Sequence, residues 1–238
     1  DPSWAGCILM TMNGVPPIEP ADLARIGKYE VRGKIGHGAT ATVYLGYDPF
    51  AQQEVAIKLF AKDTLQDSTY GRVFRHLLMN EASLAGKLAH PHIAQIYDAV
   101  VDEEQGYIVM EYVPGGTFEQ FCAPESLLPV ERVVELIFKC TRALDYAYHL
   151  GITHRDIKPA NILLGKEGLA SSDIKLTDFG AALMTASEHT QVSGVGSPAY
   201  MSPEQVREMP LTHHTDIYSL GVVMYQLLAG RLPFTASN

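Results

Sequence analysis

Cysteine is scarce in this chain, tryptophan occurs once, and no long hydrophobic run is present. The three cysteines, Cys7, Cys122 and Cys140, show neither the paired spacing of a metal site nor a disulfide framework, which favours a reducing compartment. The apolar patch from Cys7 to Met12 is too short to span a bilayer and follows no basic segment, so neither a signal peptide nor a membrane span is predicted. We therefore expect a cytoplasmic domain. Because the chain begins at Asp1 rather than Met, we expect a fragment, and any membrane anchor of the parent protein would lie outside it.

Positive charge is also in short supply. Lysine and arginine number 18 against 27 aspartates and glutamates, which gives a formal net charge of −9. This balance argues against a broad nucleic-acid-binding face, although it is compatible with a local basic site. The 238 residues, 47% of them hydrophobic and 19% charged, suffice for one large domain or two small lobes with a buried core. Composition thus predicts an ordinary soluble protein without a nucleic-acid partner.

The first half of the chain has the pattern of a sheet. Residues 1–27 hold four prolines and no sustained period, which predicts a linker or the tail of an upstream region. Residues 28–113 predict strands at Tyr29–Arg32, Thr42–Leu45, Glu54–Phe60, Ile93–Val101 and Tyr107–Glu111. A helix is predicted from Val73 to Leu88, with an apolar face formed by Phe74, Leu77, Leu78, Leu84 and Leu88. Glu81 lies on that same face, where a carboxylate needs a cation or a water-filled cleft.

The second half becomes helical after the sequence Pro114-Gly115-Gly116. A period of about 3.6 residues predicts a helix whose apolar stripe comprises Val130, Val133, Val134, Ile137, Phe138, Thr141, Leu144 and Tyr148. Another helix is predicted from about Asp216 to Leu228, carrying Ile217, Leu220, Met224 and Leu227. The fold class is therefore α+β and bilobal, with a strand-rich lobe over residues 28–113 joined by a Gly-Pro hinge to a helical lobe over residues 114–238.

One short stretch concentrates the chemistry: His154-Arg155-Asp156-Ile157-Lys158-Pro159-Ala160-Asn161. It holds an acid, two cations and an amide. Further on, Asp178-Phe179-Gly180 follows a predicted strand from Ile174 to Thr177. A carboxylate and a nearby amide, followed by a second carboxylate at a strand exit, suit the binding of a metal–phosphate complex beside a hydroxyl that must lose a proton.

Two further motifs precede this stretch. The turn Gly36-His37-Gly38-Ala39-Thr40-Ala41-Thr42-Val43 allows the backbone to approach phosphate oxygens closely, although an ordinary hairpin turn would have the same composition. Val55-Ala56-Ile57-Lys58 places a lysine on an apolar strand. Such a lysine is usually an exposed edge charge. Together with Glu81, however, it forms a candidate buried ion pair that presents an ammonium to phosphate.

These motifs occur in order and at fitting intervals, followed by Met201-Ser202-Pro203-Glu204-Gln205. As a set they resemble the signature of eukaryotic-type (Hanks-type) serine/threonine protein kinases and are most similar to the bacterial members. The resemblance covers about Tyr29 to Asn238. It implies a protein-kinase-like fold, truncated at its C-terminal end, that binds ATP and Mg2+, with Mn2+ as an alternative, between its two lobes. Protein substrates carrying serine or threonine are implied as partners, as is a kinase dimer for trans-autophosphorylation.

The resemblance also implies roles for single residues. Lys58, held by Glu81, would contact the α- and β-phosphates, Asp156 would accept the hydroxyl proton, and Lys158 would contact the γ-phosphate. Lysine at this last position resembles the serine/threonine branch, in which a weakly acidic hydroxyl benefits from a nearby cation. The metal ligands would be Asn161 and Asp178. The nucleotide site would comprise Ile35, Gly36, Gly38, Val43, Ala56, Met110 as gatekeeper, Glu111, Val113 and Leu163, with ordinary core packing as the alternative for its apolar members.

Regulation is implied by Arg155, which directly precedes Asp156 as in kinases activated by phosphorylation of the segment between Asp178 and Glu204. A phosphate on Thr190 or Ser193 would pair with Arg155 and order the segment; a solvated, hydroxyl-rich loop is the alternative. The other hydroxyls there are Thr185, Ser187 and Ser197, of which Ser197 resembles a substrate-platform residue. Asp216 resembles the buried aspartate that anchors the catalytic loop, with a helix N-cap as the alternative. His154 is interpreted as core packing against Phe179.

Three features depart from the family pattern. Ala41 replaces the third glycine of the turn, which stiffens it but leaves its N–H donors available. Ala160 and Thr117 stand where some kinases carry acids that select basic substrates, so no preference for arginine-rich sites is predicted. The chain stops soon after Phe234, before the further helices of the family. We therefore expect exposed apolar surface on the helix that begins near Asp216 and a fragment less stable than a longer chain.

Two other functions compete with that of an active protein kinase. One is a pseudokinase scaffold that binds nucleotide or partners without phosphoryl transfer, and the other is a small-molecule kinase of the same fold. A scaffold has no chemical need for the complete set of Lys58, Glu81, Asp156, Asn161 and Asp178. The platform from Ser197 to Glu204 is typical of kinases that dock peptides, which argues against the small-molecule kinase.

Overall fold

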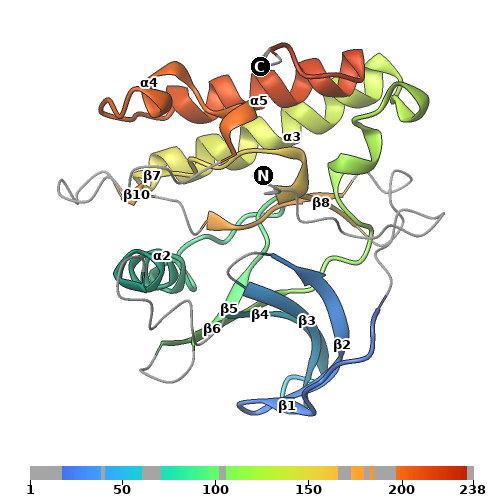
Figure 1. The fold of residues 1–238 in the computed structure, drawn as a ribbon, viewed down its shortest axis with the longest axis vertical. Helices are drawn as coiled ribbons and strands as arrows, with labels where there is room; N and C mark the ends of the chain where they lie inside the picture. The colour runs from blue at the N-terminus through green and yellow to red at the C-terminus, as the bar shows by residue number, and fades with distance from the viewer. Residues whose placement is uncertain are drawn as a thin grey trace. The chain divides into compact units, whose positions relative to one another are not determined.

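The computed structural model describes residues 18–38, 41–60, 71–101, 106–165, 173–179, 183–184 and 197–234. The chain divides into two compact units. Unit 1 comprises Asp1–Ala89 and Ala94–Pro114, and unit 2 comprises His90–Ile93 and Gly115–Asn238. Unit 1 is built on a sheet and unit 2 mainly on helices (Figure 1), so the predicted α+β class is confirmed.

Unit 1 is a six-stranded antiparallel sheet with one helix against it. Its strands are β1 (Arg25–Ile26), β2 (Tyr29–His37), β3 (Ala41–Asp48), β4 (Gln53–Phe60), β5 (Ile96–Val101) and β6 (Gly106–Glu111), in the spatial order β1-β2-β3-β4-β6-β5. Helix α2 (Gly71–Ser83) packs against β5 and β6. The predicted last turn of this helix is wrong, because residues 84–87 form turns in which Gly86 adopts a left-handed φ of +72°.

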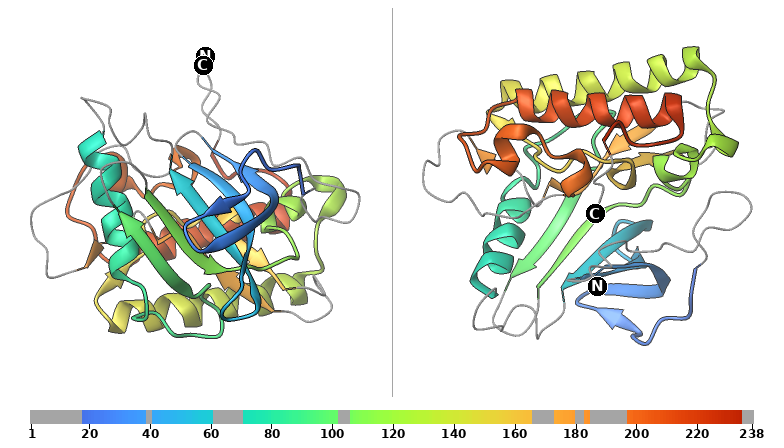
Figure 2. Two further views of the ribbon diagram at one scale, coloured as in Figure 1. Left: turned by 90° about the horizontal axis from the view of Figure 1, so that it is seen from below. Right: turned by 45° about the horizontal axis from the view of Figure 1, so that its top comes forward.

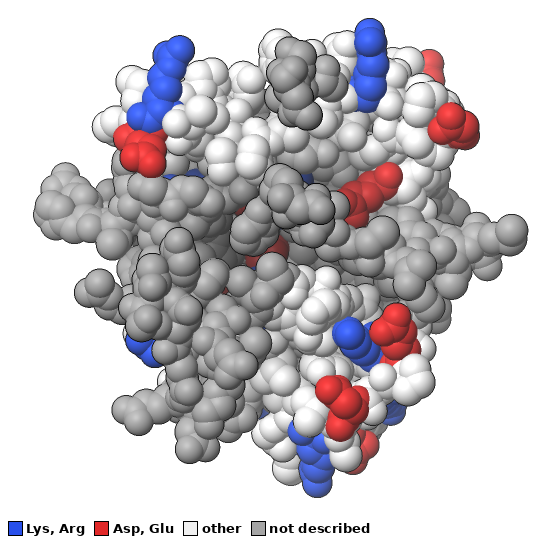
Figure 3. Space-filling view, in the orientation of Figure 1, with Lys and Arg blue, Asp and Glu red and all other residues white. Residues whose placement is uncertain are grey.

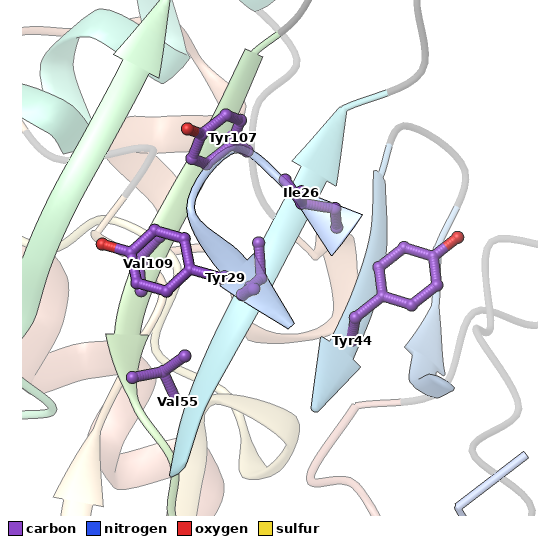
Figure 4. Close-up of a cluster of buried hydrophobic side chains, with 7 residues drawn as sticks. Ile26, Tyr29, Tyr44, Val55, Tyr107 and Val109 are labelled. Carbon is purple, nitrogen blue, oxygen red and sulfur yellow. The ribbon is translucent and has the colours of Figure 1, made fainter. Parts of the chain in front are cut away.

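Successive side chains of β4 point to opposite faces of the sheet and pack into two separate apolar cores. Val55 and Ile57 join Ile26, Tyr29, Tyr44, Tyr107 and Val109 on one face of the sheet (Figure 4). Ala56 and Phe60 lie on the other face, in a cluster with Ala41, Ile108, Met110 and, from α2, Leu78. Because successive strand residues point to opposite faces, Lys58 lies on the face that α2 covers. The period of the strand therefore explains how a lysine reaches Glu81 on that helix.

The segment before β1 is docked on the sheet. Glu19 pairs with Lys34 of β2 through two backbone hydrogen bonds of 2.9 and 2.8 Å. Tyr44 donates its hydroxyl hydrogen to Asp22, 3.0 Å away. A Cβ atom at Gly33 would lie 2.1 Å from Cγ2 of Ile18, so only glycine allows this close approach. The described part of the predicted linker thus makes specific contacts with β2 and β3.

Unit 2 centres on α3 (Val130–His149) and α5 (His214–Ala229), which pack side by side (Figures 1 and 2). Its shorter elements are η1 (Phe118–Phe121), η2 (Pro124–Ser126), β7 (Ile152–Thr153), η3 (Pro159–Asn161), β8 (Ile162–Leu164), β9 (Ile174–Leu176), β10 (Leu183–Met184), η5 (Pro198–Tyr200) and α4 (Pro203–Val206). Strand β8 pairs with β9, and β7 pairs with β10, both antiparallel. Both predicted long helices are therefore confirmed.

The face that α3 buries differs from the predicted stripe. Its buried residues are Val133, Leu136, Cys140, Ala143, Leu144 and Ala147. By contrast, Val130, Val134, Phe138 and Tyr148 of the predicted stripe are exposed. Successive residues of an α-helix are rotated by about 100°, so Val133 and Val134 belong to two neighbouring apolar rows, and periodicity alone cannot tell which row faces the core.

Helix α5 also carries apolar side chains on more than one side. It buries Leu220, Val222, Val223 and Leu227, yet Ile217 and Tyr225 expose 49% and 40% of their surfaces. Between these two, a Cβ atom at Gly221 would meet nothing within 4 Å. The expected exposure of apolar surface on this helix is confirmed. Among the described residues, no helix combines the length and the apolar character needed to cross a membrane.

Charged side chains of both signs stand next to one another on the face shown in Figure 3, as far as its residues are described. In unit 1, exposed ion pairs join Arg32 to Glu54 at 2.9 Å and Lys34 to Glu19 at 4.0 Å. Exposed pairs of this kind contribute at most about 1 kcal/mol each. The two apolar cores, rather than surface charge, therefore hold the sheet together.

Candidate active site

The backbone of the stretch from His154 to Asn161 is anchored by Asp216. Its carboxylate accepts hydrogen bonds of 2.8 Å from the N–H groups of both His154 and Arg155. Burial raises the pKa of Asp216, while those two N–H groups and the adjacent positive charge act in the opposite direction. Since α5 begins at His214, Asp216 lies inside the helix and the N-cap alternative is wrong. The anchor holds Arg155 in a left-handed conformation, with φ of +71°, directly before Asp156.

The carboxylate of Asp156 is held by donors from three residues. Lys158 Nζ lies 2.9 Å from Oδ2, and Asn161 Nδ2 donates to the same oxygen at 3.2 Å. The backbone N–H of Ser197 donates to Oδ1 at 3.1 Å. Lys158 Nζ also donates to Oγ of Ser197 at 3.0 Å. Asp156 and Lys158, which are two residues apart, thus meet a residue far along the chain, and the carboxylate has a defined orientation.

Asn161 and Asp178 are brought to the same end of a small sheet. Ile162 of β8 pairs with Leu176 of β9, and the N–H of Thr177 donates to the carbonyl of Asn161 at 3.0 Å. The antiparallel register therefore places Asn161 opposite Thr177, beside Asp178. Asp178 has a left-handed φ of +66°. A backbone held in this sparsely populated region is common at functional sites.

His154 uses both ring nitrogens for structure. Its Nε2 lies 3.0 Å from the carbonyl oxygen of Thr177, which can only accept, so Nε2 carries the proton. Nδ1 then accepts from the N–H of Asp156 at 3.3 Å. The ring packs on Phe179, with centroids 4.3 Å apart. These contacts support the interpretation of His154 as a packing residue.

Unit 1 forms the predicted ion pair. Lys58 Nζ lies 3.3 Å from Oε2 of Glu81, and only 3% of the Glu81 side chain is exposed. The pair borders a cluster that brings Ala56 and Met110 together, with Ile35 and Val43 packed against it. Four of the predicted nucleotide-binding side chains therefore gather on the α2 face of the sheet.

The remaining predicted nucleotide-site residues are placed individually. Gly36 of β2 pairs with Val43 of β3, and Gly38 donates its N–H to the carbonyl of Ala41 at 2.8 Å. At the end of β6, Glu111 N–H donates to the carbonyl of Gln95 at 2.8 Å, and half-buried Val113 follows. Leu163 lies on β8 of unit 2. The turn residues Ala39 and Thr40 lie outside the described residues.

Arg155 is buried, with 9% of its surface exposed, and its Nε has no hydrogen-bond partner among the residues that the structure describes. Burial lowers the pKa of this guanidinium, and the charge of Asp216 opposes the change. A desolvated cation of this kind is suited to a phosphate. The hydroxyls Thr185, Ser187, Thr190 and Ser193 lie outside the described residues.

The sequence-based predictions did not include Gln205. Its side chain accepts a hydrogen bond from Ser202 N–H at 3.0 Å and donates one to the carbonyl of Arg155 at 2.8 Å. A signal was present, because Ser202 followed three residues later by Gln205 is a capping-box pattern. The bond to the carbonyl of Arg155, 50 residues away, had no such signal.

The residues that could hold a metal ion are few. Among the described residues, no group of three or more histidine, cysteine, aspartate or glutamate side chains is arranged for one. Asn161 and Asp178 offer an amide oxygen and a carboxylate. Because Asn161 Nδ2 faces Asp156, its amide oxygen points away from that carboxylate. The pair suits Mg2+, which usually takes one or two carboxylates and fills its other positions with water and phosphate oxygens.

Comparison with known proteins agrees with this geometry. The protein kinase domain family matches residues 29–238. The serine/threonine-protein kinase PrkC of Bacillus subtilis is 40% identical over 215 residues, which cover 89% of this chain and 32% of that protein. The serine/threonine-protein kinase PknL of Mycobacterium tuberculosis is 35% identical over 224 residues, covering 93% of this chain and 54% of that protein. The probable serine/threonine-protein kinase PknB of Bifidobacterium longum is 35% identical over 225 residues, covering 89% of this chain and 31% of that protein.

The fold, the catalytic-loop constellation and the match together define a protein kinase domain, and the chain belongs to that family. These three relatives are named as serine/threonine-protein kinases, and all three come from bacteria. The chain spans about a third to a half of the length of these relatives. The predicted membership of the Hanks-type group, with similarity to its bacterial members, is confirmed.

Proposed function

We propose that this chain is the catalytic domain of a serine/threonine protein kinase that transfers the γ-phosphate of ATP to protein hydroxyls. The observation that carries the proposal is the carboxylate of Asp156, fixed by Lys158, Asn161 and the N–H of Ser197. A hydroxyl presented to this oriented carboxylate would be positioned for attack and would lose its proton to it.

Lys158 supports serine and threonine as the acceptors. Its ammonium contacts both the Asp156 carboxylate and the Ser197 hydroxyl, so it lies beside the oxygens among which the reaction would occur. An alkyl hydroxyl is a weak acid, and a fixed cation stabilises the negative charge that develops as phosphate is transferred. We therefore assign Lys158 to the γ-phosphate and Ser197 to its orientation.

ATP would be held by charged, backbone and apolar groups. Lys58, oriented by Glu81, would contact the α- and β-phosphates, and backbone N–H groups of the turn around Gly36 and Gly38 would meet their oxygens. The adenine ring would lie against apolar residues: Ile35, Val43, Ala56, Met110 and Leu163. Backbone groups of Glu111 and Val113 would hydrogen-bond the adenine edge. The clustering of four of these side chains in unit 1 supports the assignment.

Asn161 and Asp178 would hold the divalent metal, Mg2+ or Mn2+, that protein kinases use with ATP. When bound, this ion would neutralise charge on the phosphate oxygens. Asn161 also donates to the backbone carbonyl of Asp156 at 2.8 Å, so one residue would link the metal site to the orientation of the base.

Activation by phosphorylation is a further part of the proposal. Arg155 is buried beside the base, and within the described part of the chain its Nε has no hydrogen-bond partner. A phosphate on Thr190 or Ser193 would supply an anion for the Arg155 guanidinium and would stabilise one arrangement of the segment between Asp178 and Glu204. Removal of both hydroxyls would then leave the protein with low activity, and mass spectrometry of active protein would find phosphate in this segment.

Location and partners are also proposed. We assign the domain to the cytoplasm, with ATP and serine- or threonine-bearing proteins as its partners, and with pairing of two kinase domains during trans-autophosphorylation. The net charge of −9 supports the absence of a nucleic-acid partner. Membrane attachment would come only through regions outside this sequence.

The test is phosphoryl transfer from MgATP by the wild-type protein and by Asp156→Asn. An amide cannot accept the hydroxyl proton, so we expect kcat to fall about 10²- to 10⁴-fold while ATP still binds. Asp145→Asn, the same change at an exposed site on α3, is the matched control and should retain activity. Full activity of Asp156→Asn would refute the role of the base. ATP binding without transfer in the wild type would favour the pseudokinase scaffold.

A further inference from the structure

Gln205 joins two parts of unit 2 that are far apart in sequence. It is the third residue of the short helix α4, whose N-cap is Ser202. Ser202 Oγ accepts from Gln205 N–H at 3.3 Å, and Gln205 Oε1 accepts from Ser202 N–H at 3.0 Å. These two bonds form a capping box and satisfy donors at the helix start. They engage only the oxygen of the Gln205 side-chain amide.

The nitrogen of that amide reaches the catalytic loop. Gln205 Nε2 donates to the carbonyl oxygen of Arg155 at 2.8 Å. This carbonyl belongs to the peptide bond between Arg155 and Asp156, whose N–H donates to His154 Nδ1 at 3.3 Å. On the other side of Arg155, the N–H is held by Asp216. The peptide plane that carries Asp156 is thus held at both its oxygen and its nitrogen.

Arg155 needs such support because its backbone has a φ of +71°. This conformation costs a residue with a side chain about 1–3 kcal/mol and persists only where neighbouring groups enforce it. Rotation about the N–Cα bond of Arg155 would relieve the cost and, because it moves the carbonyl of Arg155 and the residue that follows, would also turn the Asp156 carboxylate away from Lys158 and Ser197. A bond to the carbonyl of Arg155 opposes that rotation.

We propose that Gln205 is a positioning residue for phosphoryl transfer, which orients Asp156 by holding the carbonyl of Arg155. This inference rests on the proposed kinase function and adds a residue to it. The chemistry also explains the choice of side chain. A capping box accepts either glutamate or glutamine at its third position, because it needs only an acceptor. The carbonyl of Arg155 needs a donor, and ionised glutamate has none.

The competing view is that Gln205 only caps α4. The variant Gln205→Glu separates the two roles, since it keeps the acceptor for Ser202 N–H and loses the donor for Arg155. Ser202→Ala is the complementary control, because it removes the hydroxyl that caps the helix and leaves Gln205 intact. Gln205→Met is similar in length and loses both side-chain bonds.

The experiment measures kcat, KM for ATP and the thermal midpoint of the wild type and the three variants at pH 8. For Gln205→Glu we expect kcat to fall about 10- to 100-fold, as for a small misplacement of reacting groups, with KM for ATP and the thermal midpoint near wild type. Ser202→Ala should lose thermal stability, and its kcat should fall less than that of Gln205→Glu. Gln205→Met should show both defects.

A pH profile provides the readout that a structural role would not move. A protonated glutamate has an O–H that can donate to the carbonyl of Arg155 while its other oxygen accepts from Ser202 N–H. The ratio of kcat for Gln205→Glu to wild-type kcat should therefore rise as the pH falls from 8 to 6. For Gln205→Met the ratio should stay constant.

Three outcomes would overturn the inference. One is a kcat of Gln205→Glu that equals that of the wild type at pH 8, and another is a loss of kcat that is independent of pH and follows thermal stability across the variants. The third is loss of folding in both Gln205→Glu and Gln205→Met, which would show that Gln205 has only a structural role. These outcomes differ from a failure of the proposed function, in which the wild type itself transfers no phosphate and both proposals fall.

Discussion

Lys58 and Glu81 form an ion pair across two elements of unit 1, with 3.3 Å between Nζ and Oε2. Their side chains expose 16% and 3% of their surfaces. The pair is almost removed from water, in contrast to the exposed pair between Arg32 and Glu54 on the same sheet. The two pairs allow the effect of burial to be measured within one unit.

Glu81→Gln should destabilise the protein more than Glu54→Gln. Removal of one charge from a buried pair costs about 3–5 kcal/mol, and the partial exposure of Lys58 favours the lower end of that range. Loss of an exposed pair costs at most about 1 kcal/mol. Urea unfolding of both variants measures the difference. Activity should also fall in Glu81→Gln through a raised KM for ATP, whereas equal costs for the two substitutions would argue against a structural ion pair.

Asp216→Asn should loosen the stretch from His154 to Asn161. Asp216 offers one oxygen to the N–H of His154 and the other to that of Arg155. Asparagine keeps only one acceptor, so one of these buried N–H groups would face an NH₂ group and lose its partner. An unsatisfied buried donor costs about 1–3 kcal/mol. We expect a loss of that size in unfolding free energy and a lower kcat, measured by urea unfolding and MgATP turnover. An unchanged unfolding midpoint would contradict the anchor.

His90 should make stability depend on pH. Its Nδ1 accepts from the N–H of His92, and its ring stacks on Tyr146. Burial, followed by the charges of His92, Arg142 and Lys175, lowers the pKa of His90. Burial likewise lowers the pKa of His92, whose Nδ1 contacts the carbonyl of Ile174.

Because the folded pKa of His90 lies below its unfolded value of 6.5, the unfolded state binds more protons around and below that pH. Stability contributed by neutral His90 is therefore present above pH 6.5 and is lost as the pH falls. His90→Asn keeps an acceptor for His92 N–H but does not titrate. Its urea midpoint should fall less than that of the wild type between pH 7.5 and 5.5. Identical pH dependence would exclude a contribution from His90.

Gly33→Ala should displace the segment before β1. The new Cβ would lie 2.1 Å from Cγ2 of Ile18 and 2.9 Å from the carbonyl oxygen of Glu19, so the segment must shift. Overpacking of this kind costs about 1–3 kcal/mol. Gly36→Ala is the matched control for stability, because its Cβ would meet Val43 at an ordinary distance of 3.6 Å. A double mutant with Ile18→Ala should recover part of the loss in denaturant unfolding. Equal midpoints for Gly33→Ala and the wild type would show that the segment is not held there.

The candidate site was predictable because its main groups lie in one continuous stretch or break a pattern. Asp156, Lys158 and Asn161 lie within six residues of one another, so one short loop can bring them together. Glu81 was visible as a carboxylate on an apolar helix face, and the two-residue period of β4 puts Lys58 on the side that α2 covers. The meeting of Lys158 with Ser197, by contrast, depends on contacts that no local pattern encodes.

The faces of helices and the docked segment were harder to predict for a physical reason. On α3, Val130, Val134 and Phe138 form a row as apolar as the buried row of Val133, Leu136 and Cys140, so neighbours decide which one is covered. Likewise, the prolines near the start indicate irregular backbone without showing whether it is free or docked. Strand β5 begins at Ile96, whereas Ile93 belongs to unit 2 and pairs there with Leu176.

The pairing of Glu19 with Lys34 bears on where this domain should be cut for expression. The protein kinase family match begins at Tyr29, and a protein made from that residue onward would lack β1 and the docked segment. It would lose Ile26 from the core of unit 1 and leave the backbone N–H and C=O groups of β2 at Lys34 open to another strand. Open edges of this kind favour aggregation. A boundary upstream of Ile18 would keep that edge covered, and such a protein should purify as the less aggregated of the two.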